Sequence, residues 1–378
     1  MVGGGKRDRT ADLLHAMQAL SQLSYTPKQE SRILSISSEV VKGKIAGFRR
    51  EEFSWAGYIR PTMRLALITP YLAARNGNSH TAERWRRFLV QAGHGVEMAL
   101  SWDGRPADQM IALHARRSHA SIAAFARSCP DRPLVVVLTG TDLYRDIHCD
   151  ENARQSLQLA HCIVVLQEQG VVELDRALCP RTSVIYQSAP TLVPGRKPVR
   201  SFDVCVVSHL RDEKDPFRAA LASRLLPAES RIRVRHVGGP LQDGMVQDAR
   251  ELEMQCPRWR WLGALSHGQT RQRIARAHLL VLSSRMEGGA NVICEAVTSG
   301  TPVLASRVPG NVGMLGDDYV GYFPVGDEAA LARLMGRAES SPAFYQQMVE
   351  QCGQRAPLFA PDREAAAVRE LVEAFGCG

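Results

Sequence analysis

Several features that mark other classes of protein are missing from this 378-residue sequence. No apolar run reaches the ~18 uninterrupted residues that a membrane span needs, so we expect no stable membrane association. The basic start, residues 1–14, is not followed by an apolar core with a small-residue cleavage site, which argues against a secretory signal. These absences favour a soluble protein with a cytoplasmic location.

The usual metal and disulfide patterns are absent as well. The nine cysteines are odd in number, widely scattered and never arranged as Cys-x-x-Cys, so neither a disulfide framework nor a zinc site is expected. No Asp-x-Asp occurs, and a metal that holds a diphosphate is therefore not indicated. We predict reduced, mostly buried thiols, no metal site and no cofactor.

The formal net charge of +8 is mild once its distribution is considered. Residues 1–62 contribute +4, which leaves +4 for the other 316 residues. No stripe of Lys and Arg with interleaved aromatics is present, so we expect no nucleic-acid partner. The balance suits an enzyme that handles small anions.

Residues 1–62 show no sustained period of 2 or 3.6 that would mark a core element. The run that begins at Met63 reads as a buried first strand. We therefore expect residues 1–62 to be a poorly ordered extension, or the true translation start to be Met63.

From Met63 onward strands and helices alternate, which predicts an α/β fold with parallel sheets. The first series of predicted strands ends before a proline-rich stretch, a predicted linker over 191–200, and a second series follows it. Length and pattern predict two Rossmann-like, doubly wound domains over 63–190 and 201–360, a C-terminal helix within 361–378, and a deep cleft where the carboxyl ends of both sheets meet. The predicted strands are 65–69, 96–100, 110–113, 134–139, 162–166, 183–186, 204–207, 233–237, 259–262, 279–282, 302–305 and 321–323, and the predicted helices are 81–91, 118–128, 152–160, 168–178 and 216–223.

The most informative segment runs from the strand that ends at Leu282 through a glycine-rich turn into a helix. It contains Glu287 and Glu295, which are eight positions apart. A chain with 21 Glu in 378 residues contains such a pair roughly once by chance, so the evidence for a ligand site comes from the strand, glycines and helix around the pair. Glu287 can accept hydrogen bonds from sugar hydroxyls, and Glu295 from ribose hydroxyls. The alternative is that both are exposed acids at a helix start. Around them, we expect Gly288, Gly289, Ala290, Asn291 and Val292 to hold a phosphate through backbone amides.

A second segment follows the first strand of the second domain, at 206–216. A cation placed there can neutralise the charge that develops on a departing nucleoside diphosphate. Lys214 is the first candidate, with Arg211 or His209 assisting. The alternative is a solvated charged turn.

These residues resemble the donor domain of family 4 glycosyltransferases. The resemblance rests on Lys214, the Glu287-x7-Glu295 block, the segment Ser299–Ser306 and the segment Gly326–Leu331. It implies a GT-B fold, a nucleotide-sugar donor and a C-terminal helix, here 362–375, that crosses back onto the first domain.

On the acceptor side, His114 follows the predicted strand 110–113 and by position resembles the active-site histidine of family 4 enzymes. It could equally be a satisfied core histidine. Asp142 could orient His114 or a substrate hydroxyl. After the first strand, Gly77 and Asn78 offer a close approach to a ligand, and Ser79 is a candidate helix cap.

Three arginines, Arg116, Arg117 and Arg145, are expected near the place where an acceptor enters. Arginine grips phosphate-like anions through its forked guanidinium, so their convergence would indicate an anionic acceptor. A solvated helix start is the alternative for all three.

The chain from Met63 to Phe375 most closely resembles the selenosugar synthases of selenoneine biosynthesis. This resemblance implies transfer of a hexose or N-acetylhexosamine from UDP-N-acetylglucosamine or UDP-glucose to selenophosphate. Against the broader family pattern, His209 stands where most relatives carry the diphosphate-binding Arg, Thr139 where many carry His, and Gly77-Asn78 in place of Gly-Gly. The segments that carry it are Leu113–Ser118, Leu138–Asp146, His209–Pro216, Ser284–Val292 and Arg307–Gly316.

Three other functions are compatible with the same donor residues. A family 4 hexosyltransferase would use a hydroxyl acceptor, and a non-hydrolysing UDP-sugar epimerase would need no acceptor. A sugar-nucleotide sensor would bind without turnover. Assays with and without acceptors separate them.

Overall fold

The computed structural model describes residues 62–70, 72 and 77–375, which belong to the compact unit 61–378. The expectations for the extension, including the start at Met63, concern residues outside the described part of the chain, apart from Thr62 and Met63 themselves.

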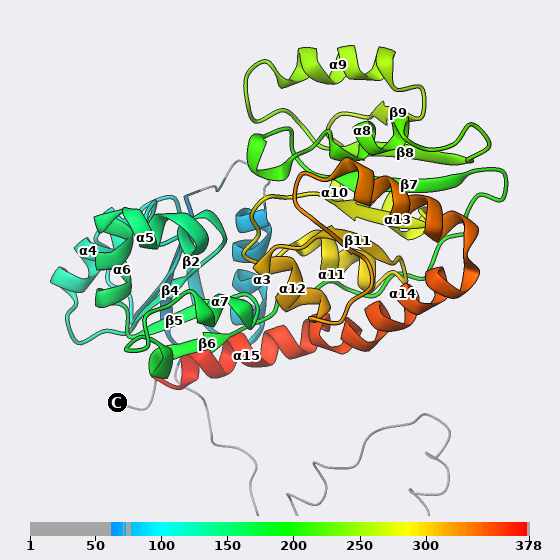
Figure 1. Ribbon diagram of the computed structural model, residues 1–378. Coiled ribbons are helices and arrows are strands. Elements are labelled where there is room, and N and C mark those ends of the chain that lie inside the picture. Colours follow the sequence, from blue (N-terminus) through cyan, green and yellow to red (C-terminus); the bar gives the residue numbers. More distant parts are fainter. Residues whose placement is uncertain (1–61, 71, 73–76, 376–378) are drawn as a thin grey trace, which may run out of the picture. The chain divides into compact units, whose positions relative to one another are not determined.

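Two six-stranded parallel sheets organise the unit (Figure 1). The first has the strand order β2-β1-β3-β4-β5-β6 and the second β12-β11-β10-β7-β8-β9. This confirms the predicted fold class of two Rossmann-like halves. The strands are β1 Arg64–Ile68, β2 Gly95–Ala99, β3 Gln109–Leu113, β4 Leu134–Val137, β5 Cys162–Val165, β6 Thr182–Val184, β7 Phe202–Val207, β8 Ile232–Val237, β9 Trp259–Trp261, β10 Leu279–Leu282, β11 Val303–Ser306 and β12 Tyr322–Phe323.

The apolar strands of the first sheet bury both of their faces. In β1, Leu65 and Leu67 pack into the core on one face, whereas Ala66 and Ile68 pack into the core on the other. Successive side chains of a strand point to opposite faces, so a continuous apolar run is the pattern of a strand covered by helices on both sides.

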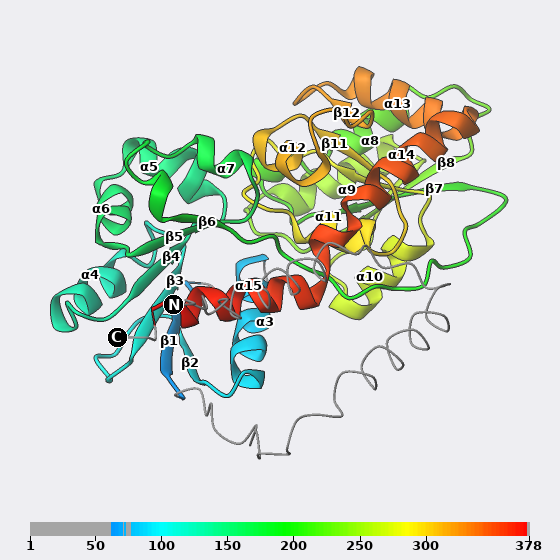
Figure 2. The same cartoon turned by 90° about the horizontal axis from the view of Figure 1, so that it is seen from below.

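Helices cover the sheets, and the last one returns to the first sheet. In both Figures 1 and 2, α15 runs beside α3, and its residues Val368, Leu371 and Val372 belong to the first sheet's core. The helices are α3 Gly77–Gln91, α4 His119–Ser128, α5 Ile147–Cys149, α6 Glu151–Leu159, α7 Gln169–Val172, α8 Arg218–Arg224, α9 Met245–Gln255, α10 His267–Arg276, α11 Asn291–Val297, α12 Pro309–Leu315, α13 Glu328–Ser340, α14 Pro342–Arg355 and α15 Pro361–Glu373.

Two local predictions were wrong. The helix expected over 168–178 is only the four-residue α7, and the chain that follows it forms turns and a short 3₁₀ helix at Cys179–Arg181. Ser79 is not a cap, since it lies inside α3.

Two further features of the described residues concern membranes and disulfides. None of their helices is long and apolar enough to cross a bilayer. Their cysteines are unpaired thiols, and five of them are buried.

Candidate active site

A cleft of about 460 Å³ lies where the strand ends of the two sheets face each other. This volume falls within the range of small-molecule sites. Every predicted donor residue lines it, as do Gly77, Asn78 and His114 from the acceptor side. Those donor residues are His209, Arg211, Lys214, Glu287, Gly288, Gly289, Ala290, Asn291, Val292 and Glu295.

Glu287 and Lys214 are direct neighbours in this cleft. The Glu287 carboxylate, on the loop between β10 and α11, accepts a hydrogen bond from Lys214 Nζ at 2.5 Å and one from Ser284 Oγ at 2.6 Å. Glu287 is buried, with a relative exposure of 6%. The loops after β7 and β10 therefore place an acid and a cation side by side, ready to hold a sugar hydroxyl and a phosphate respectively.

The glycines of this loop are needed for a reason that the sequence did not reveal. A Cβ on Gly288 would lie 2.5 Å from the carbonyl carbon of Thr139, and one on Gly289 would lie 2.7 Å from Leu166 Cβ. Both neighbours belong to the first sheet's half of the unit. The close approach that these glycines permit is thus between the two halves, beside the expected approach of a ligand.

The start of α11 has donors available for an anion. Gly289 and Ala290 donate their amides to no acceptor among the residues that the structure describes. The Asn291 side chain is engaged instead, since it accepts from Arg84 Nη1 at 3.2 Å and donates to the Gly77 carbonyl at 3.2 Å. Only the backbone amide of Asn291 is therefore suited to the predicted phosphate contact.

Glu295 is accompanied by two histidines that sequence reasoning missed. Its carboxylate contacts His267 Nε2 at 2.7 Å, and the His267 ring stacks on His80 with 5.1 Å between centroids. His80 belongs to α3 and His267 to α10. Because the two residues are far apart in the sequence, no local motif predicts their contact. They form one wall of the cleft beside the predicted ribose contact.

Among the candidate cations, Arg211 and Lys214 are better suited than His209 to hold a diphosphate. Burial lowers the pKa of His209, and the charges of Arg211 and Lys214 lower it further. A hydrogen bond with the Gly239 carbonyl raises this pKa but does not outweigh burial. The imidazole is therefore neutral near pH 7. The buried Nε of Arg211 has no hydrogen-bond partner in the part of the chain that the structure describes, and a buried unpaired donor is costly unless a ligand accepts from it.

His114 adopts a strained backbone at the end of β3. Its φ is +72°, in the left-handed region that a bulky residue rarely occupies. The ring is buried, with Nε2 at 3.2 Å from Thr141 Oγ1 and Nδ1 at 3.9 Å from Asp142 Oδ2. The strain favours a functional role over that of a core histidine.

Asp142 is fully buried and does not line the cleft, so it cannot touch a substrate hydroxyl there. Its carboxylate accepts from the backbone amides of Thr139, Gly140 and Ala115 at 2.9 to 3.0 Å. These bonds fix the loops after β3 and β4. Asp142 thereby positions His114 through the backbone, not through a direct hydrogen bond.

The three arginines do not converge on the cleft. Arg116 and Arg145 both bind the buried Asp146, at 2.8 and 3.0 Å, while Arg117 is exposed and does not line the cleft either. Burial alone would raise the pKa of Asp146, but the hydrogen bonds from Arg145 and Arg116 outweigh it and lower that pKa. Asp146, the residue after Arg145, therefore holds the guanidinium groups of Arg116 and Arg145 away from the acceptor side of the cleft.

Among the described residues, no group of three or more His, Cys, Asp or Glu side chains is placed to hold a metal ion. The residues that face the cleft include cations, backbone amides and hydroxyls that suit an anionic ligand, and the carboxylates of Glu287 and Glu295, which can accept hydrogen bonds from the hydroxyls of a ligand.

Known proteins resemble this chain in sequence. Residues 193–357 match the family described as glycosyl transferases group 1. A D-inositol 3-phosphate glycosyltransferase of Streptomyces scabiei is 27% identical over 350 residues, which cover 85% of this chain and 70% of the relative.

Solved structures share the fold. The sucrose-phosphate synthase from Thermosynechococcus elongatus aligns with a TM-score of 0.69 at 18% identity, covering 82% of this chain and 98% of that one. Anabaena HepE in complex with UDP aligns with a TM-score of 0.68 at 16% identity, covering 83% of this chain and 100% of that one. The chain is thus a glycosyltransferase with the GT-B fold, and its residues 193–357 are similar to the glycosyl transferases group 1 family.

Proposed function

We propose that the cleft binds a UDP-sugar, either UDP-N-acetylglucosamine or UDP-glucose, and transfers its sugar to an acceptor. The observation that carries the proposal is the Lys214–Glu287 contact beside the unpaired Arg211 donor and the amides at the start of α11. HepE structures described as complexes with UDP and with UDP-glucose share this fold, which supports the donor class.

In this reaction the bond between the anomeric carbon and the diphosphate oxygen breaks, and UDP leaves with both electrons. Lys214, Arg211 and the amides of Gly289 and Ala290 stabilise the charge that the departing diphosphate gains. Glu287 holds the sugar hydroxyls and thereby orients the anomeric carbon toward the acceptor side of the cleft.

For the acceptor we propose selenophosphate, whose selenium forms the new bond to the anomeric carbon. Among the described residues of the first half of the unit, none contributes a carboxylate to the cleft lining, since Asp142 is buried against backbone amides. An anionic, polarisable nucleophile needs no strong general base. The sequence resemblance to selenosugar synthases supports the same acceptor.

A hydroxyl acceptor is the second candidate. The relatives named D-inositol 3-phosphate glycosyltransferase favour it, and the buried His114 imidazole in the cleft could take the hydroxyl proton. The two candidates share every donor contact and differ only across the cleft.

The test measures UDP release from UDP-N-acetylglucosamine and UDP-glucose with selenophosphate, with inositol 3-phosphate, or with no acceptor, followed by mass analysis of the product. Release that depends on selenophosphate, with a selenium-bearing sugar, supports the first proposal. Release that depends only on a hydroxyl acceptor refutes it. A Glu287→Gln variant that retains full turnover would remove Glu287 from the mechanism, and activity lost to EDTA and restored by Mg²⁺ or Mn²⁺ would contradict the expectation of a metal-free reaction.

A further inference from the structure

The second sheet has an unusual outer edge, away from the cleft. Strands of parallel sheets are normally buried on both faces. In β8, however, the side chains alternate: Ile232 and Val234 are buried, whereas Arg233 is exposed and Arg235 is half-buried. The neighbouring edge strand β9 adds the exposed Arg260, paired in register with Arg235. One face of this edge is therefore covered with arginine side chains where a helix would ordinarily pack.

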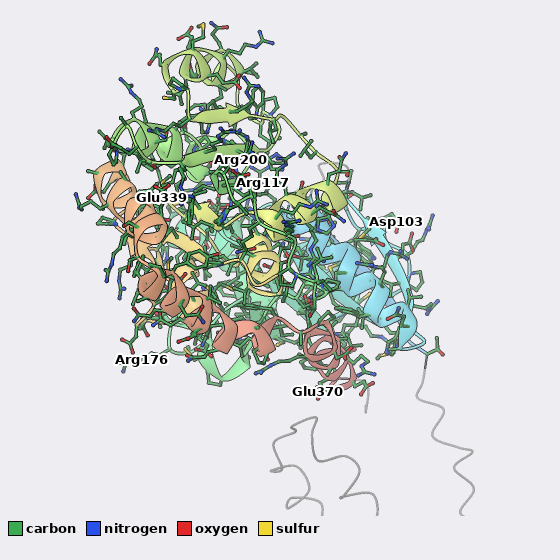
Figure 3. All side chains as sticks on the ribbon, turned by 90° about the vertical axis from the view of Figure 1, so that its right-hand side faces the viewer. Asp103, Arg117, Arg176, Arg200, Glu339 and Glu370 are labelled. Carbon is green, nitrogen blue, oxygen red and sulfur yellow. The ribbon has the colours of Figure 1, made fainter. Side chains whose placement is uncertain are left out.

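Two adjoining hollows extend this face, and we call them together the arginine surface. One lies between α10 and residues 195–198, the other over β8 and β9, and Arg235 lines both. Nine arginines line the two hollows, and Asp203 is the one acidic residue among their described lining residues. Figure 3 labels Arg200 of this surface and Glu339, which pairs with Arg231 at its margin.

Most of these arginines are not neutralised by the protein itself. Arg200, Arg233 and Arg273 form no ion pair with another described residue. Like charges on adjacent strands repel each other, so the arrangement is unfavourable until an anion binds. The pKa of Arg235 is lowered, mainly by burial. The nearby charge of Asp203 raises this pKa, whereas the charges of Arg233, Arg260 and Arg273 lower it further.

The composition of the surface favours phosphate groups on a lipid membrane over nucleic acid. Guanidinium groups bind phosphate in a forked geometry. No exposed aromatic side chain lines either hollow, so base stacking has no platform among the described residues. Close in sequence to Arg196 and Arg200 of this surface, Val193 and Val199 are 86% and 77% exposed, as suits contact with an acyl boundary.

We propose that the arginine surface docks the enzyme reversibly onto membranes rich in anionic phospholipid. The contact is peripheral, depends on charge, and lies outside the cleft residues assigned to the sugar nucleotide. It requires no membrane-spanning segment.

The test measures co-sedimentation of the full chain with two kinds of vesicle. One kind is neutral phosphatidylcholine, and the other contains about one third phosphatidylserine, an anionic lipid of cytoplasmic leaflets. Binding is expected only to the anionic vesicles and should weaken strongly when the salt concentration is raised from about 0.1 to about 0.5 M. An R200Q/R233Q/R273Q variant should bind more weakly by on the order of a hundredfold, since each arginine near an anionic surface contributes about fivefold.

A matched control removes the same three charges elsewhere. Arg127, Arg363 and Arg369 are exposed and lie outside both hollows. An R127Q/R363Q/R369Q variant should keep its vesicle affinity to within about threefold, because the lost charges lie away from the docking surface. Both variants should retain UDP release, which shows that they are folded.

Three outcomes overturn the proposal. The first is no binding of the wild-type chain to anionic vesicles. The second is an equal loss of vesicle affinity in the two triple variants, which would mean that binding depends on the total charge of the protein and not on the arginine surface. The third is a duplex RNA that binds the arginine surface and displaces the vesicles at equal phosphate concentration, which would assign the surface to nucleic acid.

Discussion

Glu364 should be the most sensitive single position for the stability of this unit. The side chain is on α15 and is completely buried, and it binds Arg84 with Nε–Oε2 at 2.6 Å and Nη2–Oε1 at 3.0 Å. It also accepts from Trp85 Nε1 at 2.8 Å, and from the amide and hydroxyl of Ser188 at 2.8 and 2.5 Å. One carboxylate thus joins α3, the C-terminal helix and the segment after β6.

The Glu364→Gln variant keeps the size of the side chain and removes its charge. The amide NH₂ must replace one oxygen, so at least two buried donors lose their acceptor, each at a cost of about 1–3 kcal/mol. Arg84 becomes a buried charge without its partner, and such losses cost about 3–5 kcal/mol. Both estimates include lost bonds of Arg84, so they are not added: a loss of about 3–5 kcal/mol, at about 2 °C per kcal/mol for a unit of this size, should lower Tm by about 6–10 °C.

Thermal unfolding followed by circular dichroism measures this change. Glu370→Gln is the control, since Glu370 is exposed on the same helix (Figure 3) and should change stability by less than about 0.5 kcal/mol. The double variant Arg84→Met/Glu364→Met should lose less than the sum of the two single variants, because no charge is left unpaired. If Glu364→Gln unfolds within about 2 °C of Glu370→Gln, a scale set by surface substitutions, the reasoning is refuted.

Four further predictions concern the cleft and the core. Lys214→Met should lower kcat by about 10²–10³, as loss of a charge-stabilising donor does, and an unchanged kcat in a UDP-release assay would exclude Lys214 from that role. Arg211→Met should raise KM for the UDP-sugar while Tm stays constant or rises, because a buried unpaired donor is removed; an unchanged KM by initial-rate kinetics would contradict this. Gly288→Ala should cost about 1–3 kcal/mol and weaken donor binding, because its methyl group meets the Thr139 backbone, whereas Gly353→Ala, with open space around it in α14, should not; equal thermal shifts would argue against the packing. Burial lowers the pKa of His236 to about 4, so the unfolded chain binds a proton more readily than the folded chain. The free energy of unfolding should therefore be constant above about pH 6.5 and fall by about 3 kcal/mol toward pH 4. Denaturant titrations at several pH values should show a weaker dependence of this free energy on pH for His236→Asn, and an unchanged dependence would exclude His236 as the cause.

The fold class and the donor side could be predicted because their signals are local. Apolar runs such as Leu279–Leu282 identify buried strands, and the donor residues follow two strand ends directly. In a parallel sheet such ends meet at one edge, so residues near them in sequence are also near the ligand site. Lys214 and Glu287 come together for this reason.

The acceptor side was harder to predict because side-chain pairing there spans the chain. Asp146 draws Arg116 and Arg145 away from the cleft, and Asp142 serves backbone amides. The stacked pair of His80 and His267, and the bond from Arg84 to Asn291, join residues about two hundred positions apart. No periodicity or local spacing carries such information.

The most direct test of the proposed chemistry is UDP release by the purified full chain with UDP-N-acetylglucosamine or UDP-glucose and selenophosphate. We expect release that requires both substrates, a product in which selenium is bound to the sugar, and loss of at least about a hundredfold in kcat in the Lys214→Met variant. Equal release with and without selenophosphate, or no release with either UDP-sugar, would contradict it.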